Sequence, residues 1–153
     1  MTKTTTARLP FVALLGLAGM LLAGCQSKPP APSARIYAVD LAGAAKSCTV
    51  PAVELADGKS AEAAMRLSND GGWCAIAVAQ RGHAPYAAGV LQTRALHGQV
   101  FIHTVGDDTR IDYTPDAGFS GTDSFAVRLI PGNPVLTVNV TVTPGAHVTE
   151  TPK

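Results

Sequence analysis

The stretch Tyr113–Phe125, Y-T-P-D-A-G-F-S-G-T-D-S-F, decides the fold of this chain. Its first residue ends a predicted strand, and Pro115 begins a turn because the proline ring fixes a backbone angle that turns use. Gly118 and Gly121 supply backbone freedom on either side of Phe119, and the next strand opens directly afterwards. A lone aromatic side chain between two glycines predicts a plug at the end of a β-sandwich core.

Alternating apolar and polar residues flank this stretch on both sides. Downstream, the segment Phe125–Leu129 predicts one core-facing strand. The segment Val135–Val142, V-L-T-V-N-V-T-V, predicts a second strand with one solvent-exposed face. Upstream, Gln99–Thr104 and Thr109–Tyr113 form a predicted hairpin around Gly106-Asp107-Asp108. Side chains of the second hairpin strand alternate between core and solvent, with Ile111 and Tyr113 inward and Arg110 and Asp112 outward.

Further strands are predicted nearer the N-terminus. Cys48–Leu55 is rich in valine but broken by Pro51, which is typical of an edge strand or a bulge. Ser60–Leu67 has a helical composition, yet its apolar residues alternate, and inside a sandwich this favours a strand. Trp73–Gln80 and Ala87–Gln92 complete the set. The pattern predicts an all-β domain over residues 36–144, an antiparallel sandwich of about seven to nine strands, followed by a flexible tail over residues 145–153.

The central stretch also resembles a known family. Tyr-Thr-Pro, Gly-Phe and Gly-x-Asp-x-Phe resemble the repeat of bacterial immunoglobulin-like and cadherin-like domains in surface proteins. The residues that fall on this pattern are Tyr113, Thr114, Pro115, Gly118, Phe119, Gly121, Asp123 and Phe125. The resemblance covers roughly residues 95–143 and implies an immunoglobulin-like sandwich in which these residues are scaffold, so it leaves function open.

The N-terminus predicts export and a lipid anchor. Lys3 and Arg8 precede an apolar run that is too short to cross a membrane as a helix, which indicates a secretory signal peptide. The ending Leu22-Ala23-Gly24-Cys25 resembles the lipobox of bacterial lipoproteins, which implies cleavage of residues 1–24 and a lipidated Cys25 that attaches the protein to the membrane. Gln26, in place of an acidic residue, resembles the outer-membrane sorting pattern. Residues 25–35 are then a lipidated cysteine and a proline-rich linker.

Charge and cysteines narrow the function classes. Removing Lys3 and Arg8 from 12 basic residues leaves 10 against 11 acidic ones, a net charge of −1, which argues against nucleic-acid binding. Cys48 and Cys74 remain as an even pair in an exported chain and predict a disulfide. A metal pair or a redox pair is the alternative, but the two cysteines lack the close spacing that those sites usually show.

The polar residues do not predict an active site. The turn around Ser120 lacks the glycine spacing of a nucleophile elbow, and His97 and His103 are too far apart on a strand to bind one metal ion. Aspartates near the turns are expected to cap backbone amides, with Asp123 bonded to its own turn at Ser120–Thr122. The alternative for them is a calcium site formed by Asp107, Asp108 and Asp116. No cofactor is predicted.

The sequence therefore predicts a non-enzymatic outer-membrane lipoprotein that presents an immunoglobulin-like domain to another envelope or surface protein. The second hypothesis is a carbohydrate- or small-ligand-binding module. Its ligand platform could use only three aromatic side chains, namely Trp73, Tyr37 and Tyr86. An enzyme is the third hypothesis, and no constellation of residues favours it.

Overall fold

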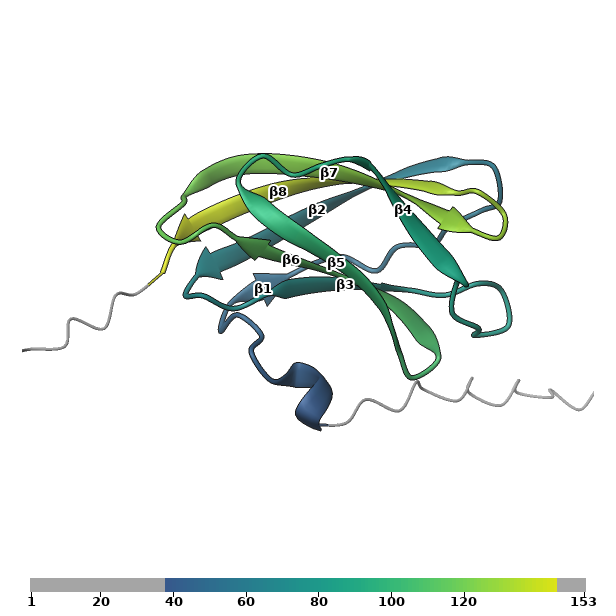
Figure 1. Ribbon diagram of the computed structural model, residues 1–153, viewed down its shortest axis with the longest axis horizontal. Coiled ribbons are helices and arrows are strands. Elements are labelled where there is room, and N and C mark those ends of the chain that lie inside the picture. Colours follow the sequence, from purple (N-terminus) through teal and green to yellow (C-terminus); the bar gives the residue numbers. More distant parts are fainter. Residues whose placement is uncertain (1–37, 146–153) are drawn as a thin grey trace, which may run out of the picture. The chain divides into compact units, whose positions relative to one another are not determined.

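The computed structural model of the protein describes residues 38–145. Residues 1–37 and 146–153 lie outside the described part, and with them the predicted signal peptide, Cys25, the linker and the tail. The described elements, in chain order, are one short 3-10 helix and eight strands: η1 (Ala38–Leu41), β1 (Cys48–Thr49), β2 (Ser60–Asn69), β3 (Cys74–Val78), β4 (Ala88–Thr93), β5 (Gly98–Val105), β6 (Asp108–Pro115), β7 (Gly121–Ile130) and β8 (Val135–Pro144) (Figure 1).

The strands form two sheets that pack face to face, which confirms the predicted all-β sandwich. The larger sheet has the order β1-β2-β8-β7-β4, and the smaller sheet has the order β3-β6-β5 (Figure 1). In the immunoglobulin fold, strands C, F and G share one sheet and B, E and D share the other. Here β4, β7 and β8 occupy the C, F and G positions, while β3, β6 and β5 occupy B, E and D. The topology is therefore immunoglobulin-like.

One strand pair corrects the prediction of a wholly antiparallel sandwich. β2 and β8 are parallel over ten residue pairs, from Ser60↔Val135 to Asn69↔Pro144. These two strands are far apart in sequence and share no hairpin, so no turn constrains their relative direction. Both bury alternate residues on the core side: Ala63, Met65 and Leu67 from β2, and Leu136, Val138, Val140 and Val142 from β8. The ambiguous segment at Ser60–Leu67 is thus a strand, as its alternation favoured, and its helical composition is overridden by packing.

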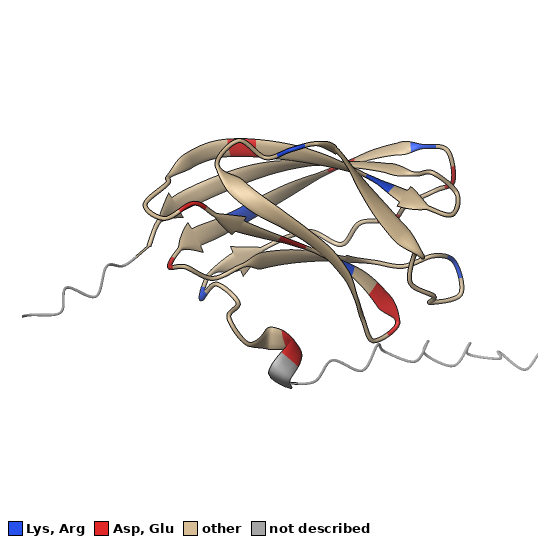
Figure 2. Cartoon of the chain, in the orientation of Figure 1, with Lys and Arg blue, Asp and Glu red and all other residues tan. Residues whose placement is uncertain are grey.

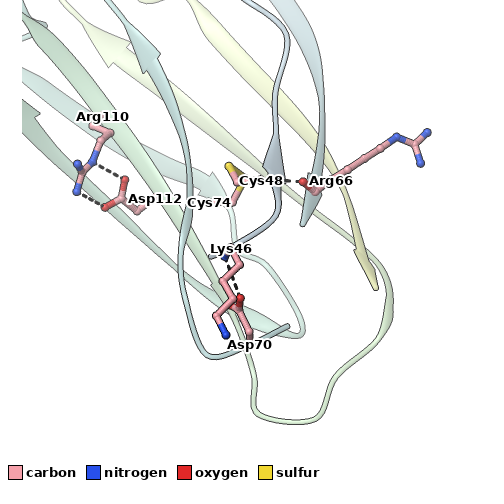
Figure 3. Close-up of a disulfide and its surroundings, with 7 residues drawn as sticks. All are labelled: Lys46, Cys48, Arg66, Asp70, Cys74, Arg110 and Asp112. Carbon is pink, nitrogen blue, oxygen red and sulfur yellow. Dashed lines mark hydrogen bonds and ion pairs between the residues drawn. A yellow bond between two sulfur atoms is a disulfide. The ribbon is translucent and has the colours of Figure 1, made fainter. Parts of the chain in front are cut away.

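A disulfide joins the two sheets. Cys48 lies in β1 at the edge of the larger sheet, and Cys74 is the first residue of β3 in the smaller sheet (Figure 3). Their sulfur atoms are 2.05 Å apart, which confirms the predicted pairing. The bond spans a sequence separation of 26 residues. In the chain-entropy description, a loop of that length stabilises the fold by roughly 3–4 kcal/mol.

The central stretch forms the turn between β6 and β7, but Phe119 is not the deep plug that the sequence predicts. Tyr113 and Phe125 are fully buried and their parallel rings lie 5.9 Å apart in the core. Phe119 is only half-buried and packs against the margin of that core. Its ring stacks on the exposed His97 ring, with 4.3 Å between centroids. The turn residue Gly118, with a φ of 77°, directs the chain over the end of the sandwich and leaves the ring at its rim.

Asp123 also differs from its predicted role. Its carboxylate does not cap the turn at Ser120–Thr122. It accepts hydrogen bonds from the backbone N–H groups of Leu96 and His97, at 3.0 and 2.8 Å, and from the following residue Ser124 at 2.8 Å. The hydroxyl of the buried Tyr113 lies 3.0 Å from the same carboxylate. Asp123 therefore ties the loop between β4 and β5 to the core, a contact across 26 residues that its own turn does not reveal.

These contacts set the electrostatics at this end of the sandwich. Partial burial by itself would raise the pKa of Asp123, but three backbone N–H donors and the Tyr113 hydroxyl outweigh it and hold the pKa below the ordinary value. Burial, and then the adjacent Asp123 carboxylate, raise the pKa of Tyr113. The tyrosine therefore stays neutral and the aspartate stays charged over the physiological range, which keeps the hydrogen bond between them intact.

Candidate functional site

The outer face of the three-stranded sheet collects the side chains with the most unusual chemistry. Strand alternation turns Cys74 and Ile76 toward the core and leaves Ala75 and Ala77 on the outer side. The register then aligns β6 and β5 on that side, where Arg110 lies opposite Ala77 and His103, and Asp112 lies opposite Ala75 and Phe101. We call this surface the outer face of the small sheet.

A polar cluster lies at the centre of this face. The Arg110 Nε donates to Asp112 Oδ1 at 2.8 Å, and the Arg110 Nη2 donates to Asp112 Oδ2 at 3.0 Å (Figure 3). The His103 Nε2 lies 3.1 Å from both Asp112 Oδ2 and Arg110 Nε, so the tautomer of the ring decides whether it donates to the carboxylate or accepts from the guanidinium. Asp112 is only 6% exposed. A carboxylate that is so buried needs this bidentate partner, and the fork fixes both side chains in place.

The cluster anchors neighbouring groups on either side. The Arg110 guanidinium lies over the Trp73 ring, 4.1 Å from its centroid, and an Arg110 Nη1 group donates to the backbone carbonyl of Asp40. The Trp73 Nε1 donates to the Ala42 carbonyl at 3.1 Å. The Phe101 ring tilts against the His103 ring, with 4.7 Å between centroids. The segment before β1 is therefore held onto the outer face of the small sheet through Trp73 and Arg110.

A groove of about 310 Å³ lies between that segment and the strands. Ala75 and Ala77 line it from β3, while Trp73, Leu41 and Val105 supply larger apolar walls. Its remaining lining includes the charged residues Asp108 and Arg110, and Arg110 is already engaged. Because the alanines leave space that larger side chains would fill, the groove can accept an apolar group of a few heavy atoms. Its volume falls at the lower end of the range for small-ligand sites, about 300–1,000 Å³.

The predicted aromatic platform is not assembled. Trp73 lies on the alanine face, as its position in the sequence suggests, and packs beside Ala75 and Ala77. Tyr86 is only 5% exposed and belongs to the core, so it cannot contact a ligand. Burial, followed by the nearby Asp57 carboxylate, raises the pKa of Tyr86. Tyr37 lies outside the described residues. The prediction is wrong for Tyr86 because a tyrosine in a loop can turn its ring inward, and sequence alone does not show which way it turns.

The alternative calcium site is not formed either. Asp107 and Asp108 lie at the tip of the β5–β6 hairpin, whereas Asp116 follows the far end of β6. A strand of eight residues separates the two ends by roughly 26 Å, because each residue advances about 3.3 Å. Within residues 38–145, no three His, Cys, Asp or Glu side chains come close enough together to hold a metal ion.

Sequence reasoning placed Arg110 and Asp112 on the outer face but missed their partners. His103 and Phe101 complete the cluster, and Phe101 is 63% exposed. The signal was present in the hairpin: a two-residue turn at Gly106-Asp107 pairs Val105 with Asp108, and counting back aligns His103 with Arg110. The three-residue turn Gly106-Asp107-Asp108 that the sequence predicts would shift this alignment by one residue and hide the cluster.

Charge is spread thinly over the domain. Figure 2 shows Lys, Arg, Asp and Glu scattered along the strands and loops of the described residues 38–145. No protein-family model matches the chain, and no curated protein matches it either. Between residues 38 and 145 there is no helix with the length and apolar character needed to cross a membrane.

Proposed function

We propose that the chain is an outer-membrane lipoprotein, anchored through acyl chains on Cys25, that presents its immunoglobulin-like domain as a non-enzymatic protein-interaction module in a cell-envelope or surface assembly. The positive start, the apolar run and Leu22-Ala23-Gly24-Cys25 support the anchor. The proline-rich residues 25–35 suit a spacer between membrane and domain. The resemblance of Tyr113–Phe125 to modules of bacterial surface proteins supports presentation.

The observation that carries the interaction function is the groove on the outer face of the small sheet. Leu41 at the groove and Phe101 on the same sheet face are 56% and 63% exposed. Exposed apolar side chains beside a preformed apolar recess, rimmed by polar groups, are typical of protein-recognition surfaces. The Arg110–Asp112 fork fixes these two side chains of β6 beside the groove, so this part of the surface loses little side-chain conformational entropy when a partner binds.

A site-specific photo-cross-linker at Leu41 tests this function in living cells. We expect ultraviolet light to yield one discrete adduct with an envelope protein. Ala77→Glu should abolish that adduct, because it places a charge in the groove at an exposed position with little effect on folding. The control is Asn139→Glu, which adds the same charge at an exposed position of the larger sheet and should leave the adduct unchanged. If the Ala77→Glu variant gives the same adduct as the parent, the proposal is contradicted.

A small-ligand or carbohydrate function is the second candidate, and the volume of the groove favours considering it. A sugar ring needs an open aromatic face, and the Arg110 guanidinium already covers one face of Trp73. The groove suits a small apolar ligand better than a glycan. Retention on a glycan resin that Trp73→Ala removes, without any protein adduct at Leu41, would replace the first proposal with this one.

The anchor has a separate test. Cys25→Ala should leave an uncleaved precursor that incorporates no labelled fatty acid, because the thiol that accepts the lipid is gone. Normal maturation and labelling of that variant would refute the lipoprotein assignment. Fractionation of the parent between inner and outer membranes tests its location, and an inner-membrane result would refute the sorting inferred from Gln26.

A further inference from the structure

The four sheet edges differ in their protection against pairing with another strand. β1 has two residues, and β4 has a register shift between Leu91 and Thr93. β3 has five residues, and the chain just before it is bridged by Ala44 at Trp73. β5 runs for eight residues in unbroken register with β6 and contains no proline and no charged residue (Figure 2). Natural edge strands are usually short, bulged, charged or proline-containing, so β5 is the unprotected edge.

The geometry of the β5–β6 hairpin determines which backbone N–H and C=O groups of β5 point away from β6. A two-residue turn makes Val105 and Asp108 a hydrogen-bonded pair, and pairs then alternate along the ladder. The pair Gly98↔Pro115 falls on a non-hydrogen-bonded position, in agreement with the missing N–H of proline. Residues with even numbers therefore direct their N–H and C=O groups away from β6. Among residues 38–145, no backbone group from a turn or loop pairs with these outward-facing positions of β5.

The strand itself contains no Lys, Arg, Asp or Glu, although the exposed Arg94 lies near its start, at a pocket that Gly98, Gln99 and Val100 also line. Gln99, Phe101 and His103 lie on the outer face, and Phe101 is 63% exposed in the middle of the strand. Val100 and Ile102 turn inward and pack against the core. A partner strand at this edge would cover the exposed ring of Phe101.

We propose that two copies of the chain pair antiparallel through β5, related by a two-fold axis, so that the two three-stranded sheets form one continuous sheet. A strand edge is complementary to itself under this rotation, since each outward N–H faces a C=O of the other copy. This inference goes beyond the proposed function, because self-pairing requires neither the lipid nor a second kind of protein.

Strand geometry limits the dimer to two registers that overlap along most of β5. Opposite residues of an antiparallel pair point to the same face, so an outer-face residue must lie opposite an outer-face residue. One register centres the axis on Phe101, which then lies opposite Phe101 of the second copy. The other centres it on Ile102 and places Phe101 opposite His103 of the second copy. Both registers put an aromatic ring against Phe101 at a closely spaced, non-hydrogen-bonded pair, where cross-strand side-chain contacts are strongest.

The second copy fits this edge better than an arbitrary extended segment does. Each copy brings an eight-residue strand without Lys, Arg, Asp or Glu and an exposed aromatic ring, whereas an unrelated segment would have to supply both. The pairing also continues the outer face of the small sheet across the dimer, which brings two copies of the groove onto one surface. A net charge of −1 on each chain without residues 1–24 adds little repulsion.

The test is the mass of the full-length protein, purified from envelopes in mild detergent and measured by sedimentation with the detergent contribution subtracted. We expect a concentration-dependent dimer. Phe101→Lys places like charges near the axis, and Thr104→Pro removes an outward N–H that the domain itself does not use. Each variant should weaken the dimer at least tenfold. Asn139→Lys adds the same charge on the larger sheet and should leave the dimer intact.

Melting curves of the two variants show whether a weaker dimer results from a lost contact or from a destabilised domain. Phe101 and Thr104 are exposed, so both variants should melt close to the parent. If Thr104→Pro melts much lower, Phe101→Lys alone decides the question. A parent that stays monomeric at all concentrations overturns the proposal, and so does a dimer that persists unchanged in Phe101→Lys.

Discussion

Asp123→Ala should destabilise the domain at least as much as Phe119→Ala, the reverse of the order that the sequence predicts. As a deep plug, Phe119 would cost about 3–5 kcal/mol on truncation to alanine. Its half-buried ring instead keeps part of its contact with water in the folded state and stacks on His97. Partial burial and one aromatic contact together contribute about 1–2 kcal/mol.

The loss at Asp123 comes from the groups that it leaves behind. Three backbone N–H groups and the hydroxyl of Tyr113 converge on the carboxylate at 2.8–3.0 Å. Water can reach the N–H groups of the exposed Leu96 and His97, and the Tyr113 hydroxyl can still donate to the His97 carbonyl at 3.1 Å. The free energy of unfolding still falls by about 2–3 kcal/mol, because the variant loses the charge-assisted hydrogen bonds of Asp123 and with them the link between the β4–β5 loop and the core.

Urea unfolding of the domain, produced from residue 36 and exported so that its disulfide forms, measures both values. Since 1 kcal/mol shifts the melting temperature of a domain near 100 residues by about 4 °C, the two variants should also separate in thermal scans. Asn139→Ala is the matched control at an exposed strand position and should change stability by less than about 0.5 kcal/mol. A loss above 3 kcal/mol for Phe119→Ala with less than 0.5 kcal/mol for Asp123→Ala refutes this reasoning.

Three further outcomes are expected. The pKa of Asp123 in the folded state lies below the ordinary 3.8, so the stability that its carboxylate contributes is present above pH 3.8 and is lost as the pH falls through the folded-state pKa. In an acid titration, Asp123→Asn should therefore lose stability less steeply than the parent. Equal slopes for the two proteins would contradict this. Replacing Cys48 and Cys74 together by serine should lower the free energy of unfolding by roughly 3–4 kcal/mol, and an unchanged urea midpoint would show that the bridge is dispensable. Arg110→Ala should lower the free energy of unfolding by about 2–4 kcal/mol, because it leaves the buried carboxylate of Asp112 without its guanidinium partner. Replacing both residues by leucine should recover most of that loss. A double variant as unstable as the single one would show that the loss does not come from the unpaired carboxylate.

Much of the fold follows from local pattern. Alternation along β6, β7 and β8 identifies the buried rows, because a strand turns successive side chains to opposite sides. The same rule placed Cys74 inside, and an even pair of cysteines in a chain that the sequence predicts to be exported then indicated Cys48 as its partner. Glycines and prolines marked the turns, since few other residues adopt their backbone angles.

The candidate site was predicted less well, because its contacts join side chains from different strands. Trp73 was placed on the correct face, because that depends on strand parity alone. The burial of Tyr86, the stacking of Arg110 on Trp73 and the alignment of His103 with Asp112 depend on how separate strands meet. A shift of a single residue in the length of one turn was enough to hide that alignment.

The sequence by itself determined that the described domain is an all-β sandwich, which faces its strands present and which cysteines pair. These properties depend on neighbours one or two positions away, or on a count of cysteines. Tertiary structure alone decided that β2 runs parallel to β8, that Asp123 reaches Leu96 and His97, and that β5 is left at an open edge. Each of these depends on which distant strands become neighbours when the two sheets close over a shared core. That choice is made by the packing of the whole domain, because the backbone of any strand can pair equally well in several places.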